Sequence, residues 1–313
     1  MRVTAAQTRL GPLAERPFLI LFLGRTVSMT GSAIAPLALA FAVIHLTGSP
    51  SDLGLVLAAS FVPQVIFLLV GGVWADRLPR HLVMVASDVV GAAAQATAAI
   101  LLLLAQAQVW HIVVLAAVRG IASAFFVPAS SAVVPQTVRP DLLQQANALL
   151  GLSRNATGIL GAAGGGVPVA VVGPGWALAG DAATYLLGAC IVAFLRLPSA
   201  AVIATRRPFL NELAEGWQEV RSRTWLWTII TQFTFINAFS WAAFFVLGPF
   251  VAHDELGGPA VWGLILMAQA CGMLSGGFLA LRFRPRRPLF AGNLAILLIA
   301  LPLAALALPA GIP

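Results

Sequence analysis

The sequence predicts an all-α integral membrane protein, a bundle of helices that cross the bilayer. Three observations predict it. The chain has 313 residues, of which 60% are hydrophobic and only 9% are charged, whereas soluble domains average about 25% charged residues. The apolar residues form repeated stretches of about 20, the length that a helix needs to cross the hydrocarbon core. The basic residues are confined almost entirely to alternate connections between these stretches.

Nine apolar stretches are predicted to form membrane-spanning helices. Their connections are short and carry helix breakers, as in the segments 47–50 (TGSP) and 257–259 (GGP). We expect the first stretch to be a retained helix rather than a signal peptide, because it is long and lacks a small-residue cleavage site. In chain order the predicted spans are 18–44, 53–75, 83–105, 110–134, 146–172, 176–197, 225–251, 259–281 and 288–309.

The placement of arginine predicts the orientation of the chain. All 18 basic residues are arginine. Apart from Arg25 and Arg119, which lie inside spans, they occur before the first span or around the connections that follow the second, fourth, sixth and eighth spans. The positive-inside rule therefore predicts a multi-pass protein of the cytoplasmic membrane with a cytoplasmic N-terminus. Arginines at the cytoplasmic membrane surface also account for the net charge of +7. We therefore expect no nucleic-acid partner.

Two cytoplasmic connections resemble each other and predict an internal repeat. Segment 71–81 reads GGVWADRLPRH and segment 276–286 reads GGFLALRFRPR. Aligning Gly72 with Gly277 pairs the second span with the eighth, which predicts a six-helix unit duplicated in parallel, as in secondary transporters. The predicted organisation is an N-terminal six-helix bundle (1–197), a cytoplasmic amphipathic linker (198–224) and a partial C-terminal bundle (225–313).

The connection after the second span resembles the loop signature of the major facilitator superfamily. Its matching residues are Gly72, Asp76, Arg77 and Arg80, with Pro79 at a position where the family has glycine. Gly72 permits close helix packing, and the charged residues are suited to ion pairs at the cytoplasmic face. The resemblance implies that this cluster latches the two halves of the protein in an outward-facing state.

Two further segments agree with that family. The fourth span contains Arg119 and Gly120 in a pattern similar to the family's buried-arginine signature. The glycines of the fifth span are similar to the signature of the exporter branch, with Ala162 in place of proline. Within this branch the chain resembles the enterobactin-exporter and macrolide-efflux group. The resemblance implies a major facilitator-type helical bundle, with a complete six-helix N-terminal half and a partial, three-helix C-terminal half.

Three charged residues within predicted spans are candidates for transport or coupling. Arg119 lies near the bilayer midplane, where a charge costs about 2.5–3.5 kcal/mol on insertion scales. It either orients substrate and couples protons, as the resemblance implies, or holds helices together. Arg25 lies about 11 Å from the cytoplasmic end of the first span, and it either has a role in transport or extends its side chain to the headgroups. Asp88 either carries a proton or pairs with the loop cluster. For Asp181 we expect a structural role in the first turn of its helix.

Two further sets of residues are candidates by their position. A small-residue face on the fifth span predicts close packing and a hinge between halves; it comprises Gly158, Gly161, Gly165 and Gly166. The seventh span corresponds to a helix that lines the central cavity in the family, so the resemblance implies that its polar and aromatic residues line the cavity. These are Gln232, Asn237 and Trp241.

The sequence shows no pattern of an enzyme, a metal site or a cofactor site. Its four histidines are scattered over different connections without ligand spacing. A nucleotide-binding phosphate loop requires a lysine, and the chain has none. We therefore expect no cofactor and no metal, and transport driven by an ion gradient rather than by ATP.

The expected function is secondary active export of a small molecule, drug- or siderophore-like, by proton antiport with alternating access. The expected partners are the substrate, the proton and the lipid bilayer, and oligomeric state is left open. The alternative is a truncated, transport-incompetent membrane protein, or an assembly or binding component. It is motivated by helix number, because the second half is predicted to stop after three helices.

Overall fold

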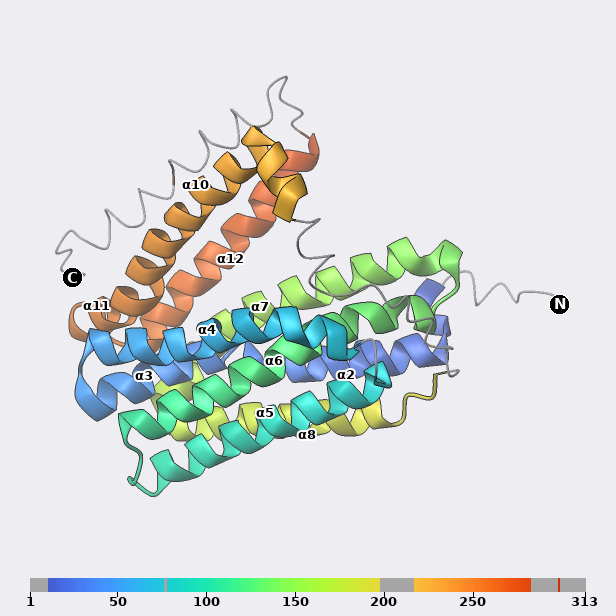
Figure 1. Cartoon of the computed structure of the whole chain (residues 1–313). Helices are drawn as coiled ribbons and strands as arrows, with labels where there is room; N and C mark the ends of the chain where they lie inside the picture. Colours follow the sequence, from blue (N-terminus) through green and yellow to red (C-terminus); the bar gives the residue numbers. More distant parts are fainter. Residues whose placement is uncertain (1–10, 76–77, 198–216, 283–297, 299–313) are drawn as a thin grey trace.

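The computed structural model describes residues 11–75, 78–197, 217–282 and 298, and every regular element in these ranges is a helix (Figure 1). Short helical turns, η1 (Gly11–Ala14) and η2 (Pro140–Leu142), precede α2 and α7. The longer helices are α2 (Arg16–Ser32), α3 (Ala35–Thr47), α4 (Pro50–Ala75), α5 (Arg80–Leu103), α6 (Val109–Thr137), α7 (Leu143–Val172), α8 (Pro174–Ala193), α10 (Thr224–Trp241), α11 (Gly248–Asp254) and α12 (Pro259–Arg282).

Most predicted spans correspond to one helix, and two do not. The first predicted span is divided into α2 and α3 at Ala33 and Ile34. Pro36 explains this break, because a proline has no N–H to donate to the carbonyl of Ser32. The seventh span consists of α10, a π-helical segment η3 (Ala242–Leu247) and α11. Each nevertheless remains one segment long and apolar enough to cross a membrane, Arg16–Thr47 and Thr224–Asp254.

Several expectations lie partly or wholly outside the described residues. The ninth span, 288–309, is outside them apart from residue 298. Of the predicted amphipathic linker, residues 217–222 are helical and the segment 198–216 is outside the described ranges. In the described ranges, seven helical segments are long and apolar enough to cross a membrane, and Pro259–Met273 adds a shorter apolar helix. The structure thus confirms an all-helical membrane protein, while the division into six and three helices stays a prediction.

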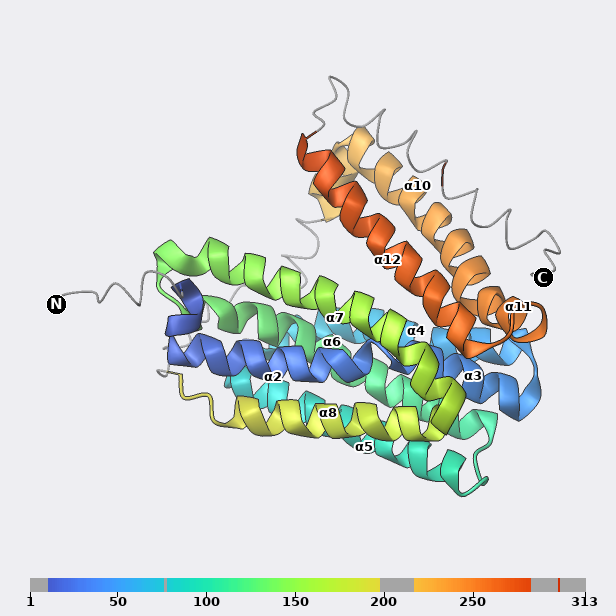
Figure 2. The same cartoon turned by 180° about the vertical axis from the view of Figure 1, so that it is seen from behind.

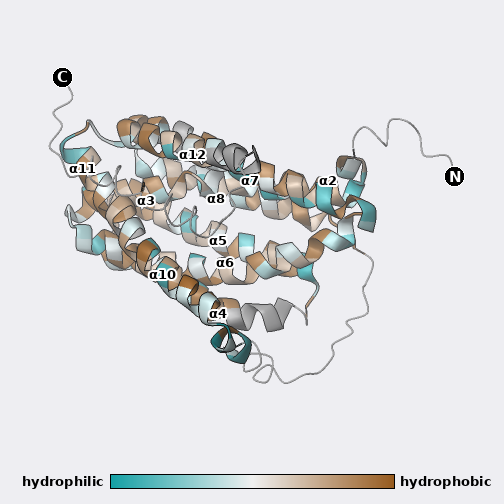
Figure 3. Cartoon of the chain, turned by 90° about the horizontal axis from the view of Figure 1, so that it is seen from above, coloured by the Kyte–Doolittle hydropathy of each residue, from teal (hydrophilic) through white to brown (hydrophobic). Residues whose placement is uncertain are grey.

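The N-terminal helices form a bundle in which α2 and α5 pack against α8, and α4 packs against α6 (Figures 1 and 2). Small residues permit these close approaches. A Cβ atom on Gly188 of α8 would lie 2.9 Å from the carbonyl oxygen of Gly24 in α2. Hydrophilic residues gather near the ends of the helices, and hydrophobic residues cover most of their length (Figure 3). This distribution is the one expected for helices that face lipid.

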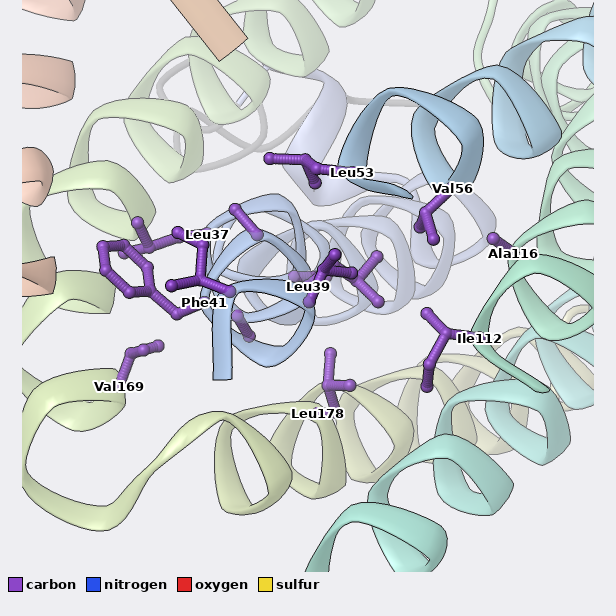
Figure 4. Close-up of a cluster of buried hydrophobic side chains, with 14 of the residues drawn as sticks. Leu37, Leu39, Phe41, Leu53, Val56, Ile112, Ala116, Val169 and Leu178 are labelled. Atoms are coloured by element: carbon purple, nitrogen blue, oxygen red, sulfur yellow. The ribbon is translucent and has the colours of Figure 1, made fainter. Parts of the chain in front are cut away.

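Two apolar clusters fill the bundle at different depths. One surrounds α3 and includes Phe41, Leu53, Ile112 and Leu178 (Figure 4). The second contains Phe18 of α2 together with residues from α5, α6, α7 and the end of α8. Between them, the buried residues of α2 are small or polar: Gly24, Ser28 and Gly31. A polar layer therefore lies between two apolar clusters.

The C-terminal helices contact the N-terminal bundle where α12 packs against α7 and α11 packs against α3, and α10 and α12 diverge from the bundle toward their other ends (Figures 1 and 2). At the contact, Gly166 of α7 packs against the backbone of α12, where an added Cβ would lie 2.8 Å from the carbonyl oxygen of Pro259. Trp262 is buried there and lies directly against Gly248. Close packing between α7 and α12 thus joins the two parts of the chain at one end.

We expect Gly120→Ala to destabilise the bundle. A Cβ on Gly120 of α6 would overlap the carbonyl oxygen of Ser60 in α4, and forced overpacking typically costs about 1–3 kcal/mol. The matched control is Gly151→Ala in α7, because nothing lies within 4 Å of a Cβ at Gly151. That control should gain about 0.5–1 kcal/mol from helix propensity. Thermal unfolding in detergent measures both variants, and equal midpoints would contradict the tight α4–α6 contact.

Candidate functional site

A polar cavity of about 180 Å³ lies inside the N-terminal bundle, between α2, α5, α6 and α8. Its walls combine hydroxyl groups with charged and aromatic side chains. The polar residues that line it are Ser28, Ser32, Ser87, Asp88, Arg119, Ser123 and Tyr185. These residues come from four helices that are far apart in the sequence, so the cavity exists only in the folded bundle.

Asp88 is buried on the inner face of α5, with only 2% of its surface exposed. Because α5 begins at Arg80, Asp88 is in the third turn of the helix and not near its end. The hydroxyl of Ser28 in α2 lies 3.5 Å from its Oδ1 atom, and Gly188 of α8 leaves room beside Oδ2. Arg25 of α2 is a charged neighbour. Asp88 thus lies in the polar layer of the bundle.

Asp181 is a buried acid whose position in its helix the sequence analysis misplaced. It was expected in the first turn of its helix, but α8 begins at Pro174 and has no acid in its first turn. Only 1% of Asp181 is exposed. Gln95 Nε2 of α5 donates a hydrogen bond to its Oδ2, and Ser32 Oγ lies 3.5 Å from its Oδ1. The sequence did contain a signal of its importance: Asp181 lies well inside an apolar stretch, and an acid within the membrane is functional by default.

Arg119 lies on α6 at the border of the cavity. Its Nη2 atom is 3.5 Å from Ser60 Oγ in α4, and Gly120 beside it permits the close approach of α4. Asp181 and Tyr185 are electrostatic neighbours. The Nε atom of Arg119 is buried and has no hydrogen-bond partner among the described residues. Arg119 also forms a side-chain hydrogen bond with Tyr185, so the guanidinium joins α6 to both α4 and α8.

Arg25 is half-buried on α2, where its charged neighbours are Asp88 and Arg154 of α7. Its Nε atom is also buried without a hydrogen-bond partner in the described part of the chain. Thr26, the next residue, exchanges a 2.7 Å hydrogen bond with Ser153 of α7. The structure therefore places Arg25, half-buried, within electrostatic range of Asp88.

The predicted glycine face on α7 divides into three environments. Gly161 packs against Ala33, where α2 ends, and Gly165 packs against Ile34. Gly166 contacts α12, as described above. Gly158 is exposed, with nothing within 4 Å of a Cβ placed on it. Three of the four glycines thus contact either the break in the first span or the C-terminal helices.

Of the remaining predicted residues, Gln232, Asn237 and Arg80 are not among those that line this cavity. Gln232 and Asn237 are exposed on α10, and Asn237 donates a hydrogen bond to the carbonyl of Phe233. Trp241 ends the same helix. Gly72 is in the last turn of α4, and Arg80 donates a 2.9 Å hydrogen bond to the carbonyl of Ala132 in α6. The other two loop residues, at positions 76 and 77, lie outside the described residues.

The described residues contain no group of three or more histidine, cysteine, aspartate or glutamate side chains suited to a metal. The cavity is lined instead by one acid, one guanidinium, hydroxyl groups and an aromatic ring, with a second acid directly behind it. Helices that span the membrane surround it. Fold and site together define a polytopic membrane protein with a polar cavity inside a helical bundle, an arrangement typical of transporters.

The chain belongs to the Major Facilitator Superfamily, whose family model matches residues 21–312. It is 28% identical over 269 residues to Macrolide efflux protein A of Streptococcus pyogenes, covering 84% of this chain and 65% of that protein. It is 28% identical over 286 residues to the Multidrug efflux pump Tap of Mycolicibacterium fortuitum, covering 86% of this chain and 66% of that protein. The chain thus spans about two thirds of the length of these relatives.

A solved structure has the same fold. A bacterial homolog of the human lysosomal transporter Spinster, in an inward-facing and unoccupied conformation, superposes with a TM-score of 0.65 at 15% identity, covering 91% of this chain and 65% of that one. These findings confirm the predicted family and its efflux-type relatives. The chain is a multi-pass membrane protein of a transporter family and is not an enzyme.

We expect a cysteine in the cavity to react with a water-soluble, charged methanethiosulfonate reagent. The background replaces Cys190 and Cys271, which are both exposed, with serine. Ser123→Cys places a thiol on the cavity wall, and Val90→Cys places one on the exposed face of α5, beside cavity-lining Gly91. Thiolates, the reactive species, form in water and not in lipid. Mass spectrometry of treated membranes should therefore show Ser123→Cys labelled and Val90→Cys unlabelled, and equal labelling would contradict a polar cavity.

Proposed function

We propose that this chain is a secondary active transporter that exports a small, drug-like molecule in exchange for protons by alternating access. The observation that carries the proposal is the group of buried charges around the cavity. A charge inside a membrane bundle is costly and is retained where it has a function. Asp88 supplies a group that can bind and release a proton, while Arg25 and Arg119 supply fixed positive charge beside it.

Relatives with efflux functions support the direction of transport and the class of substrate. Two similar proteins are named for the efflux of macrolides and of multiple drugs. The chemistry of the cavity lining suits such molecules, since apolar residues adjoin hydroxyl groups and a guanidinium. Because macrolides carry many carbonyl, ether and hydroxyl oxygens, Arg119 is the group that we assign to hydrogen-bond them.

The arrangement of the two parts of the chain supports alternating access. The C-terminal helices touch the bundle through α11 and one end of α12, and α10 and α12 diverge from it toward their other ends (Figures 1 and 2). With the N-terminus in the cytoplasm, the diverging end faces the cytoplasm and the conformation is inward-facing. Gly166 of α7 then lies at the close contact about which the parts move, and Gly161 and Gly165 pack against the break in the first span. In the outward-facing state the cytoplasmic side is closed by the loop residues Gly72, Asp76, Arg77 and Arg80. The segment 198–224 links the two halves, 1–197 and 225–313.

We expect Arg119→Ala to abolish transport without preventing membrane insertion. The probe is radiolabelled erythromycin, a macrolide, whose uptake into inverted membrane vesicles is measured with an imposed pH gradient. Removing the guanidinium removes the substrate contact and the charge that faces Asp181, so accumulation should fall to the level of vesicles without the protein.

The matched control is Arg139→Ala, because Arg139 is exposed and pairs with Glu15 at the surface. Surface ion pairs contribute about 0–1 kcal/mol, so this variant should retain its activity. Normal uptake by Arg119→Ala would contradict the role of Arg119. Uptake by the unsubstituted chain that ignores the gradient would contradict proton antiport.

The orientation is tested by labelling intact cells with a membrane-impermeant maleimide in the cysteine-free background. Gln106 is exposed in the connection between α5 and α6, and Asp141 is exposed in the connection between α6 and α7. With a cytoplasmic N-terminus, Gln106→Cys faces outward and Asp141→Cys faces the cytoplasm. We expect only the former to be labelled, and the reverse pattern would show the opposite orientation.

A further inference from the structure

We propose that His45 and His253 bind a divalent transition metal ion that bridges the two parts of the chain at their joined end, where α11 packs against α3 and α12 against α7. The two histidines are far apart in the sequence, and the fold brings their rings together. An ion held there acts as an inhibitor and not as a cofactor. Metal binding is independent of the proposed transport, whereas the inhibition rests on the proposed alternating access.

The two histidines belong to the two parts of the chain that meet at this end. His45 lies in the last turn of α3, within the N-terminal bundle. His253 lies in the last turn of α11, on the C-terminal side of the joint. Their ring centroids are 6.3 Å apart, and the ring planes form an angle of 67°. An ion bound to both rings therefore joins α3 to α11.

The separation of the two rings is within reach of a single metal ion. A Zn–N bond is about 2.0–2.1 Å long, so two imidazoles on one ion have ring centroids about 5–6 Å apart. The observed 6.3 Å requires only a small rotation of the rings toward each other. Both side chains are exposed, and exposed side chains change rotamer within nanoseconds. Imidazole suits zinc, copper and nickel, whereas magnesium and calcium prefer oxygen ligands.

Asp254 orients His253 for metal binding. Its Oδ1 atom accepts a 2.8 Å hydrogen bond from Nδ1 of His253. With the proton of the neutral imidazole held on Nδ1, the lone pair of Nε2 is available to a metal ion. A carboxylate in this position fixes the orientation of a ligating histidine and raises its basicity. Asp254 thus has the place that carboxylates commonly take behind a metal-bound histidine.

Apolar packing beneath the histidines fixes their spacing in the joined state. The ring of His253 also lies against Phe41 of α3, with the ring centroids 6.5 Å apart. Phe41 is fully buried in the apolar cluster that includes Ala252 of α11 and Trp262 of α12. If the two parts separate at this end, His253 moves away from His45. The metal site therefore exists only while the joint is closed.

The number of protein ligands is suited to reversible inhibition. The described residues contain no group of three or more potential metal ligands, so water completes the coordination of an ion held by the two histidines. Structural zinc sites, in contrast, have four protein ligands. With the N-terminus in the cytoplasm, the joined end faces outward. An ion that binds there from the external medium stabilises the inward-facing conformation and slows transport.

The binding test measures thermal unfolding of the purified full chain in detergent, with and without Zn²⁺. An ion that binds the folded state stabilises it, so Zn²⁺ should raise the unfolding midpoint, and Mg²⁺ should not. The rise should be lost in His45→Gln and in His253→Gln, and the double variant should lose no more than either alone. The matched control is His111→Gln, because His111 is partly exposed near the start of α6 and its ring contacts Trp110.

Two outcomes of the binding test would overturn the proposal. One is an unfolding midpoint of the unsubstituted chain that does not respond to Zn²⁺. The other is an equal rise in His45→Gln, because the ion would then be held on α11 alone and would bridge nothing. Asp254→Ala should raise the Zn²⁺ concentration needed for half of the effect by about 10–100-fold. An unchanged concentration would contradict the orienting role of Asp254.

The transport test measures efflux of radiolabelled erythromycin from intact cells, with Zn²⁺ or Mg²⁺ in the medium, and compares each variant with its own rate without metal. Zn²⁺ should slow efflux by the unsubstituted chain and by His111→Gln, but not by His45→Gln or His253→Gln. Inhibition that persists in His45→Gln would overturn the proposal. Zn²⁺ binding by both histidines with efflux that ignores Zn²⁺ would retain the metal site and reject the inhibition. Absence of erythromycin efflux by the unsubstituted chain would contradict the proposed function, and the binding test would still decide on the site.

Discussion

The burial of charge inside a membrane-embedded bundle is the constraint on which the rest of this structure depends. Lipid offers no hydrogen bonds, so a charged side chain must face the bundle interior and find partners on other helices. Asp88, Asp181, Arg25 and Arg119 meet this requirement on four different helices. Helices can bring such groups together only if their backbones approach closely. Glycine at the contacts between α2 and α8, and between α4 and α6, permits that approach.

The two apolar clusters lie on either side of the polar layer. The cluster around Phe41 closes the bundle on one side of the layer, and the cluster that contains Phe18 closes it on the other. The polar side chains of the cavity thus lie between two apolar parts of the bundle.

The break in the first span and the glycines of α7 place a helix break and close packing beside the charged groups. Pro36 interrupts the helix near the residues that contact Asp181, and Gly161 and Gly165 pack onto the same break. The helix α7 continues to Gly166 and the contact with α12. One continuous helix therefore touches the break in the first span and the C-terminal helices. Packed contacts of this kind transmit small displacements, because protein interiors are close to incompressible.

The sequence by itself determined the class, the family and most of the helices of this protein. Hydrophobic length and arginine placement are local properties of the chain, and the loop and span motifs are short. The tertiary structure alone decided which intramembrane groups meet. Gln95 and Asp181 are 86 positions apart, and no periodicity of the sequence relates residues at that distance.

Asp181 was misplaced because the start of α8 depends on Pro174, and the break in the first span was missed because apolar residues continue through it. Gln232 and Asn237 proved to be exposed on α10, because which face of a uniformly apolar helix meets the bundle depends on packing and not on composition.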